Sequence, residues 1–181
     1  MKTCVHAGWR RAAWSVGALA FGVYLWNANQ WVPRWLMEPE EQMLRAAAPL
    51  GPLPSVDQFS VDELEVHPGT RLQKVSVLGW ILPPDEWRDP AAGATRCEIV
   101  FKGDRAWYRL EPGQYVRKDV RDIFRVENVR AVTGYRARFS PVAMKKGTYR
   151  MGVVVCAGTN DLAVAWAPFA FIQDRQGFRT Q

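Results

Sequence analysis

The sequence predicts an all-β domain, an antiparallel β-sandwich, preceded by one N-terminal transmembrane helix. Three observations predict it. Residues 12–33 carry no charge; beyond residue 56 apolar and polar residues alternate, as is typical of strands; and turn-forming residues separate the alternating segments. The chain has 181 residues, a formal net charge of +6 and nine tryptophans, and this length allows one domain and an anchor.

Residues 12–33 are the expected transmembrane helix. They reach about 33 Å at the helical rise, which exceeds the roughly 30 Å of a bilayer core. Residues 1–11 contain Lys2, Arg10 and Arg11 and no acid, so they are the expected cytoplasmic tail, and the C-terminal domain is expected in a bacterial periplasm. A cleaved signal peptide and a buried core helix are the alternatives.

Aromatic and small residues mark this anchor. Tryptophan is typical of the two membrane–water interfaces, and glycine allows a second helix to approach closely. The residues expected in these roles are Trp9, Trp14, Gly17, Gly22, Trp26 and Trp31. We therefore expect a single-pass protein of the bacterial inner membrane, with other integral membrane proteins as its partners.

Residues 34–55 are predicted to contain a short helix and a proline-rich spacer. Acidic residues begin the candidate helix at 38–48, where the helix dipole favours them, and Pro49 ends it. Prolines 49, 52 and 54 predict an extended, stiff spacer that holds the domain away from the membrane. The β-sandwich is expected over residues 56–174 and a C-terminal tail over 175–181.

Alternation predicts seven strands in the sandwich. Their expected ranges are 64–67, 74–82, 95–102, 105–110, 134–140, 148–156 and 162–171. Tyr135 and Phe139 are expected in the core, with Arg136 and Arg138 on the opposite face. Residues 116–128 have the apolar spacing of one or two turns of amphipathic helix instead.

The segment Gly147-Thr148-Tyr149-Arg150-Met151 resembles the tyrosine corner of immunoglobulin-like sandwiches. The resemblance implies an immunoglobulin-like antiparallel β-sandwich in which the Tyr149 hydroxyl bonds to the backbone of the preceding connection. Met151 stands where an immunoglobulin domain has its second core cysteine, so the inter-sheet disulfide of that family is not expected.

A second set of motifs, over residues 77–155, is similar to a β-sandwich module of bacterial membrane proteins that is found near cell-surface glycan assembly. The motifs are Leu78-Gly79-Trp80-Ile81, Ile99-Val100-Phe101, Trp107-Tyr108, Arg117-Lys118-Asp119-Val120, Gly134-Tyr135 and Gly147-Thr148-Tyr149. This resemblance implies a glycan context and no assigned activity.

Enzyme, metal and cofactor chemistry find little support in the sequence. The two histidines are His6 and His67, no phosphate-binding loop or G-x-S-x-G motif occurs, and the three cysteines form no C-x-x-C pair. We therefore expect no catalytic residue, metal or cofactor, and no nucleic-acid partner outside the cytoplasm. The sequence does not decide whether Cys97 and Cys156 form a disulfide. Alternation places the two side chains on opposite faces of the sheet unless a bulge intervenes.

Arginine and tryptophan are the candidate contacts to a partner or ligand. Arginine binds phosphate and carboxylate groups and stacks on aromatic rings, so a face with several arginines is a candidate binding surface. The alternative is a solvated face whose arginines are partly paired with Asp104, Glu111, Asp119, Asp122 and Glu127. The candidates are Trp87, Trp107, Arg105, Arg109, Arg136 and Arg138. The expected function is a non-catalytic, membrane-anchored accessory or structural subunit, and the alternative is a glycan or lipid-phosphate binding module of the cell envelope.

Overall fold

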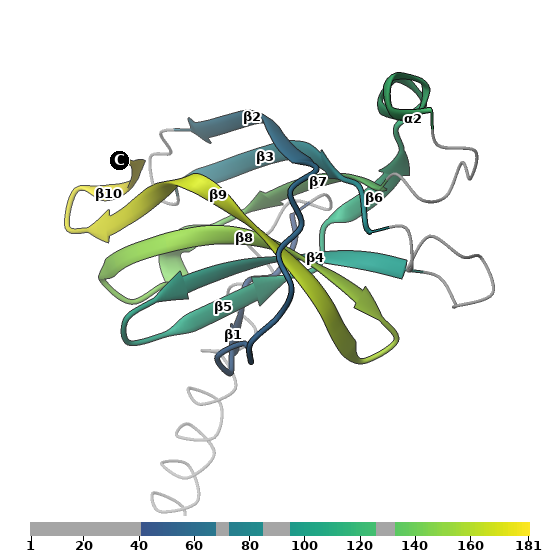
Figure 1. Ribbon diagram of the computed structural model, residues 1–181. Helices are drawn as coiled ribbons and strands as arrows, with labels where there is room; N and C mark the ends of the chain where they lie inside the picture. Colours follow the sequence, from purple (N-terminus) through teal and green to yellow (C-terminus); the bar gives the residue numbers. More distant parts are fainter. Residues whose placement is uncertain (1–40, 68–72, 85–94, 126–132) are drawn as a thin grey trace, which may run out of the picture. The chain divides into compact units, whose positions relative to one another are not determined.

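The computed structural model describes residues 41–67, 73–84, 95–125 and 133–181. These residues form two antiparallel sheets (Figure 1), so the all-β prediction is confirmed. Within the same ranges no helix has the length and hydropathy needed to cross a bilayer. The expected anchor, with Trp9, Trp14, Gly17, Gly22, Trp26 and Trp31, lies outside the described residues.

The six-stranded sheet has the order β1-β5-β4-β8-β9-β10 and the four-stranded sheet the order β2-β3-β7-β6. The first consists of β1 (Arg45–Ala47), β4 (Thr95–Gly103), β5 (Trp107–Leu110), β8 (Gly147–Ala157), β9 (Asn160–Asp174) and β10 (Gly177–Thr180). The second consists of β2 (Phe59–His67), β3 (Lys74–Ile81), β6 (Gly113–Val116) and β7 (Thr133–Phe139), and the helix α2 (Lys118–Phe124) and the 3-10 turn η3 (Pro141–Ala143) lie between strands. All seven predicted strands are present, and β1, β6 and β10 are additional.

The two sheets share one apolar core. In β7, Tyr135 and Phe139 are fully buried while Arg136 is exposed, as the alternation predicts. Phe139 meets Phe101 of β4, in the other sheet, with the ring centroids 5.2 Å apart. Burying each such ring stabilises the fold by roughly 2 kcal/mol, and the contact joins the two layers.

Two predicted turns connect neighbouring strands of the six-stranded sheet. The β4–β5 connection follows Gly103, whose N–H donates to the carbonyl of Ala106 over 3.0 Å. The β8–β9 connection is a two-residue turn that begins with Gly158 at a φ of +59°. Glycine suits that position because a side chain disfavours a positive φ.

The prediction of a helix at 38–48 is wrong for residues 41–48, the part of this segment that the structure describes. Residues 45–47 form β1, which pairs antiparallel with β5, so that Arg45 lies opposite Arg109. Before β1, the Gln42 N–H donates to the Arg138 carbonyl of β7 over 2.7 Å. The edges of β7 and β5 therefore satisfy the backbone of this segment, and tertiary pairing overrides its helical propensity.

The proline-rich segment packs on the six-stranded sheet of the domain. The prediction that it forms an extended spacer is therefore wrong. We call residues 48–56 the strap, because they run from β1, at one edge of the six-stranded sheet, to the part of β9 around Val164 that β10 does not pair with (Figure 1). There the Val164 N–H donates to Pro54 and the Val56 N–H donates to Val164, each over 3.0 Å. Leu50 and Leu53 pack on the outer face of the sheet, over Val100, Val154, Cys156 and Val164.

The C-terminal residues also belong to the sheet. The tail expected at 175–181 contains β10, which pairs with the end of β9. Phe178 of β10 is buried and stacks on Phe171, with the ring centroids 4.6 Å apart. The compact unit thus runs from Glu41 to Gln181 and is longer at both ends than the expected 56–174.

Candidate functional site

The predicted contact residues are divided between the two sheets. Arg136 and Arg138 lie on the outer face of the four-stranded sheet, whereas Trp107 and Arg109 lie on the outer face of the six-stranded sheet. Arg105 is exposed in the turn before β5. These candidates therefore lie on two different faces, because β5 and β7 belong to different layers. Trp87 lies outside the described residues.

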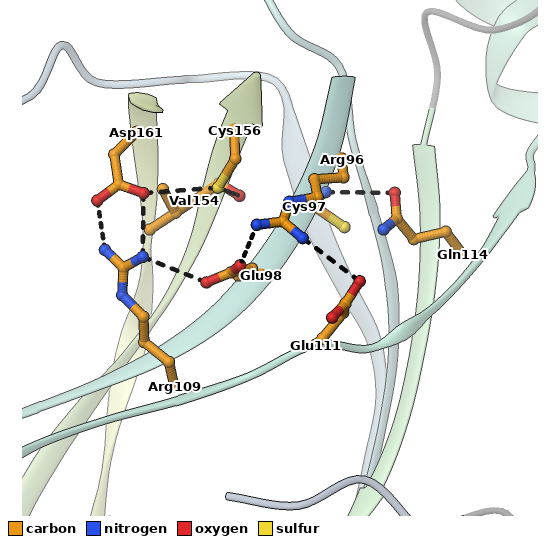
Figure 2. A network of polar contacts seen from close by, with 9 residues as sticks. All are labelled: Arg96, Cys97, Glu98, Arg109, Glu111, Gln114, Val154, Cys156 and Asp161. Atoms are coloured by element: carbon orange, nitrogen blue, oxygen red, sulfur yellow. Dashed lines mark hydrogen bonds and ion pairs between the residues drawn. The ribbon is translucent and has the colours of Figure 1, made fainter. Parts of the chain in front are cut away.

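Arg109 is held in an ion-pair network on the six-stranded sheet (Figure 2). Its guanidinium binds the carboxylate of Asp161 with both terminal nitrogens, and one of them also donates to Glu98 over 3.2 Å. The hydrogen bond to Asp161 is the largest cause that raises the pKa of Arg109. Two carboxylates neutralise this arginine, so its charge stabilises the sheet instead of attracting a ligand.

The network continues along β4. Arg96 lies between Glu98, at 3.1 Å, and Glu111, at 3.6 Å (Figure 2). The Cys156 thiol points to Asp161 on the same face, with the sulfur 3.6 Å from a carboxylate oxygen. Two arginines and three acids therefore compensate one another in this part of the face.

The two described cysteines are free, and both are buried. Cys97 is in the main core, whereas Cys156 is in the apolar cluster beneath the strap. Burial is the main cause that raises the pKa of both thiols, that of Cys156 to about 12. The register shift beside Cys156 does not turn it into the core, so the opposite-face interpretation is confirmed and no disulfide forms.

Next to this network lies a group of two indoles and two cations, which we call the indole–cation cluster: Lys102, Trp107, Arg150 and Trp166. The indoles of Trp107 and Trp166 meet edge to face, with centroids 6.1 Å apart. Lys102 Nζ lies 5.6 Å from the centroid of Trp107 and 5.8 Å from that of Trp166. The Arg150 guanidinium carbon lies 5.6 Å from the Trp166 centroid. The cluster combines aromatic surface with two positive charges.

The sheet holds Trp166 firmly in this position. Its ring lies over Gly152 of β8, where a Cβ atom would come within 2.7 Å of the ring. Leu50 and Leu53 of the strap belong to the apolar cluster that Trp166 joins. Arg150 Nε donates to the carbonyl of Ala167 over 3.2 Å, at an irregularity of the β8–β9 pairing. The indole and the guanidinium are therefore preorganised.

A second surface is apolar and lies on β6 and α2. The helix predicted within 116–128 is present as α2, and Val120 packs with Leu82 and Trp80 on the outer face of the four-stranded sheet. The other apolar side chains of this segment are exposed: Tyr115 by 38%, Val116 by 45%, Ile123 by 74% and Phe124 by 39%. Val120 is buried and Phe124 contacts the Trp80 ring with the centroids 5.5 Å apart, whereas Ile123 is the most exposed residue of the predicted apolar stripe.

Arg117 fixes this segment to the opposite edge of its sheet. Its guanidinium binds Asp119 and also Asp62 of β2, at the register shift between β2 and β3. The side chain passes over Gly134 of β7, where a Cβ atom would come within 2.8 Å of it. The exposed apolar residues of β6 and α2 are thus presented on a rigid support.

Sequence reasoning missed Lys102 and Trp166 and did not single out Arg150 among the arginines. Each lies at a solvent-facing position of a predicted strand, but their proximity depends on the pairing of β4 with β8 and β9, which alternation does not reveal. In the described part of the chain, no group of three or more histidine, cysteine or acidic residues has the arrangement to hold a metal ion. Comparison of the chain with protein-family models, curated proteins and solved structures found no match.

Proposed function

We propose that the protein is a non-catalytic accessory or structural subunit, anchored in the bacterial inner membrane by residues 12–33, that presents an immunoglobulin-like β-sandwich in the periplasm to partner membrane proteins. The uncharged length of residues 12–33, the basic residues before them and the tryptophans at both ends support the anchor and its orientation.

The exposed apolar surface of β6 and α2 is the observation that carries the partner role. Soluble monomers rarely expose several large apolar side chains together, and such surfaces are typical of protein interfaces. Ile123 and Phe124 are exposed on a helix that Val120 and Arg117 hold in place. We propose an apolar surface of another membrane protein as the partner of this segment.

Protease accessibility tests the topology. Protease added to spheroplasts of cells that make the full-length protein is expected to digest residues beyond 41, while the same protease leaves them intact in unbroken cells. Complete protection of the C-terminal domain in spheroplasts would exclude the periplasmic location.

Photo-crosslinking in living cells tests the partner surface. A photoreactive amino acid at Ile123 is expected to form a defined adduct with one membrane protein, whereas the same group at Val142 is expected to form none. Val142 is the matched control, because it is 61% exposed in η3, away from α2. Equal adducts at both positions, or none at Ile123, would contradict the proposed interface.

A further inference from the structure

We infer that the indole–cation cluster on the outer face of the six-stranded sheet is a binding site for a phosphorylated sugar, in which Lys102 and Arg150 hold the phosphate and the indoles of Trp107 and Trp166 contact the sugar ring. This site is separate from the β6–α2 surface, so either proposal can fail without the other.

The pairing of the two cations is the first step. Lys102 of β4 and Arg150 of β8 are direct cross-strand partners, and both side chains are exposed. Like charges placed opposite each other on neighbouring strands destabilise a sheet. An anion bound between them would turn this repulsion into two attractive contacts.

The surrounding charges make this pair distinctive. On the same face, Arg109 and Arg96 are each paired with acids. Among the described residues, no carboxylate forms an ion pair with Lys102 or Arg150, and their recorded contacts are the indole faces and the Ala167 carbonyl. The cluster therefore keeps two positive charges for a ligand.

Charge and shape together favour a sugar phosphate. A phosphomonoester carries a charge between about −1.5 and −2 at neutral pH, which matches one lysine and one arginine. Arginine donates two parallel hydrogen bonds to phosphate, and lysine adds a point charge. The C–H groups of a sugar ring pack on aromatic surface, and Trp107 and Trp166 supply such surface in direct contact with the two cations.

Calorimetric titration of the full-length protein in phosphatidylcholine nanodiscs tests the site. The probes are glucose 1-phosphate, inorganic phosphate, glucose and phosphatidylglycerol vesicles. Glucose 1-phosphate is expected to bind about tenfold or more tightly than inorganic phosphate or glucose, and the vesicles are expected not to compete with it. Equal affinity for inorganic phosphate or for glucose, preferential binding of the vesicles, or no binding of glucose 1-phosphate would overturn the proposal.

Substitutions locate the binding. Lys102→Gln and Arg150→Gln are each expected to weaken glucose 1-phosphate binding about tenfold or more. Trp107→Leu is expected to weaken the binding of glucose 1-phosphate and to leave the weak binding of inorganic phosphate unchanged. Arg136→Gln, an exposed arginine on the other sheet, is the matched control and is expected to bind like the unmodified protein. Unchanged affinity in Lys102→Gln, at an exposed position of β4, would overturn the assignment.

Discussion

The hydroxyl of Tyr149 donates a hydrogen bond to the backbone carbonyl of Lys145 over 2.8 Å, across the connection that enters β8. The sequence predicts this bond, and the structure contains it. The N–H of the same Lys145 donates to the hydroxyl of Tyr108 over 2.9 Å, and the two tyrosine rings meet edge to face at 5.7 Å. The buried side chains of Tyr108 and Tyr149 thus bind the backbone N–H and the carbonyl of Lys145.

Tyr149→Phe is expected to lower the free energy of unfolding by about 1 to 2 kcal/mol, because it removes the hydroxyl and leaves the Lys145 carbonyl without that donor. Thermal unfolding of the full-length protein in detergent measures the change. Arg136→Ala, at an exposed position of β7, is expected to change stability by less than about 0.5 kcal/mol. Equal losses from both variants would contradict the inside and outside assignment of the strands.

Gly79→Ala is expected to destabilise the domain by roughly 2 kcal/mol or more, as overpacking does. The added Cβ would come within 2.2 Å of the Ser60 carbonyl and 2.4 Å of the Tyr135 hydroxyl, which are themselves hydrogen-bonded over 2.8 Å. Gly51→Ala is the matched control, because its Cβ would meet no atom within 4 Å. Chemical denaturation of both variants compares them, and a neutral Gly79→Ala would contradict this packing.

Asp119 is expected to titrate near pH 2. The hydrogen bond from Arg117 is the largest cause that lowers its pKa from 3.8 to about 2. Because the folded pKa is depressed, the interaction stabilises the fold fully above about pH 3.8 and is lost as the pH falls towards 2. Carboxyl chemical shifts in NMR spectra follow this titration.

Arg117→Gln should return the Asp119 midpoint towards 3.8. Arg121→Gln is the matched control, because Arg121 forms an ion pair with Asp122. This substitution should leave the titration midpoint of Asp119 unchanged. A midpoint that follows Arg121 instead of Arg117 would show that the ion pairs of α2 are arranged differently.

Cys97 and Cys156 are expected to resist maleimide in the folded protein and to react fully after denaturation. Both thiols are buried and their pKa values are raised, so accessible thiolate is scarce. Mass spectrometry of a Cys4→Ser variant counts the labels without a contribution from the third cysteine. Finding a Cys97–Cys156 disulfide by non-reducing peptide mapping would refute their placement on two faces of the sheet.

A chain that begins at residue 41 is expected to fold, whereas one that begins at residue 57 is expected to be unstable or insoluble. The shorter chain lacks β1 and the strap, and therefore exposes the edge of β5 and the apolar cluster around Val100 and Val164. Soluble yield and thermal unfolding compare the two pieces. Equal stability would mean that the strap contributes nothing to the domain.

A point substitution isolates the strap in the complete chain. Leu53→Ser removes a partly buried side chain that packs on this cluster and is expected to cost about 1 kcal/mol of stability. Val142→Ser, at an aliphatic position that is 61% exposed, is expected to be nearly neutral. A neutral Leu53→Ser would contradict the packing of the strap.

Local periodicity determined most of the secondary structure. The alternation of Tyr135 and Phe139 with Arg136 and Arg138 identifies β7 and its inner face, because strand side chains point alternately to opposite sides whatever the strand pairs with. The turn at Gly158 and the corner at Tyr149 are equally local, since their partners lie within a few residues along the chain.

Tertiary structure decided what depends on distant backbone. Residues 45–47 have helix-forming composition, but the open edge of β5 makes them a strand, and the strap lies on the sheet because Val100, Val154 and Val164 offer an apolar surface to Leu50 and Leu53. The indole–cation cluster also required the structure. Lys102 and Arg150 are far apart in sequence, and the register of β4 with β8 alone places their charges opposite each other.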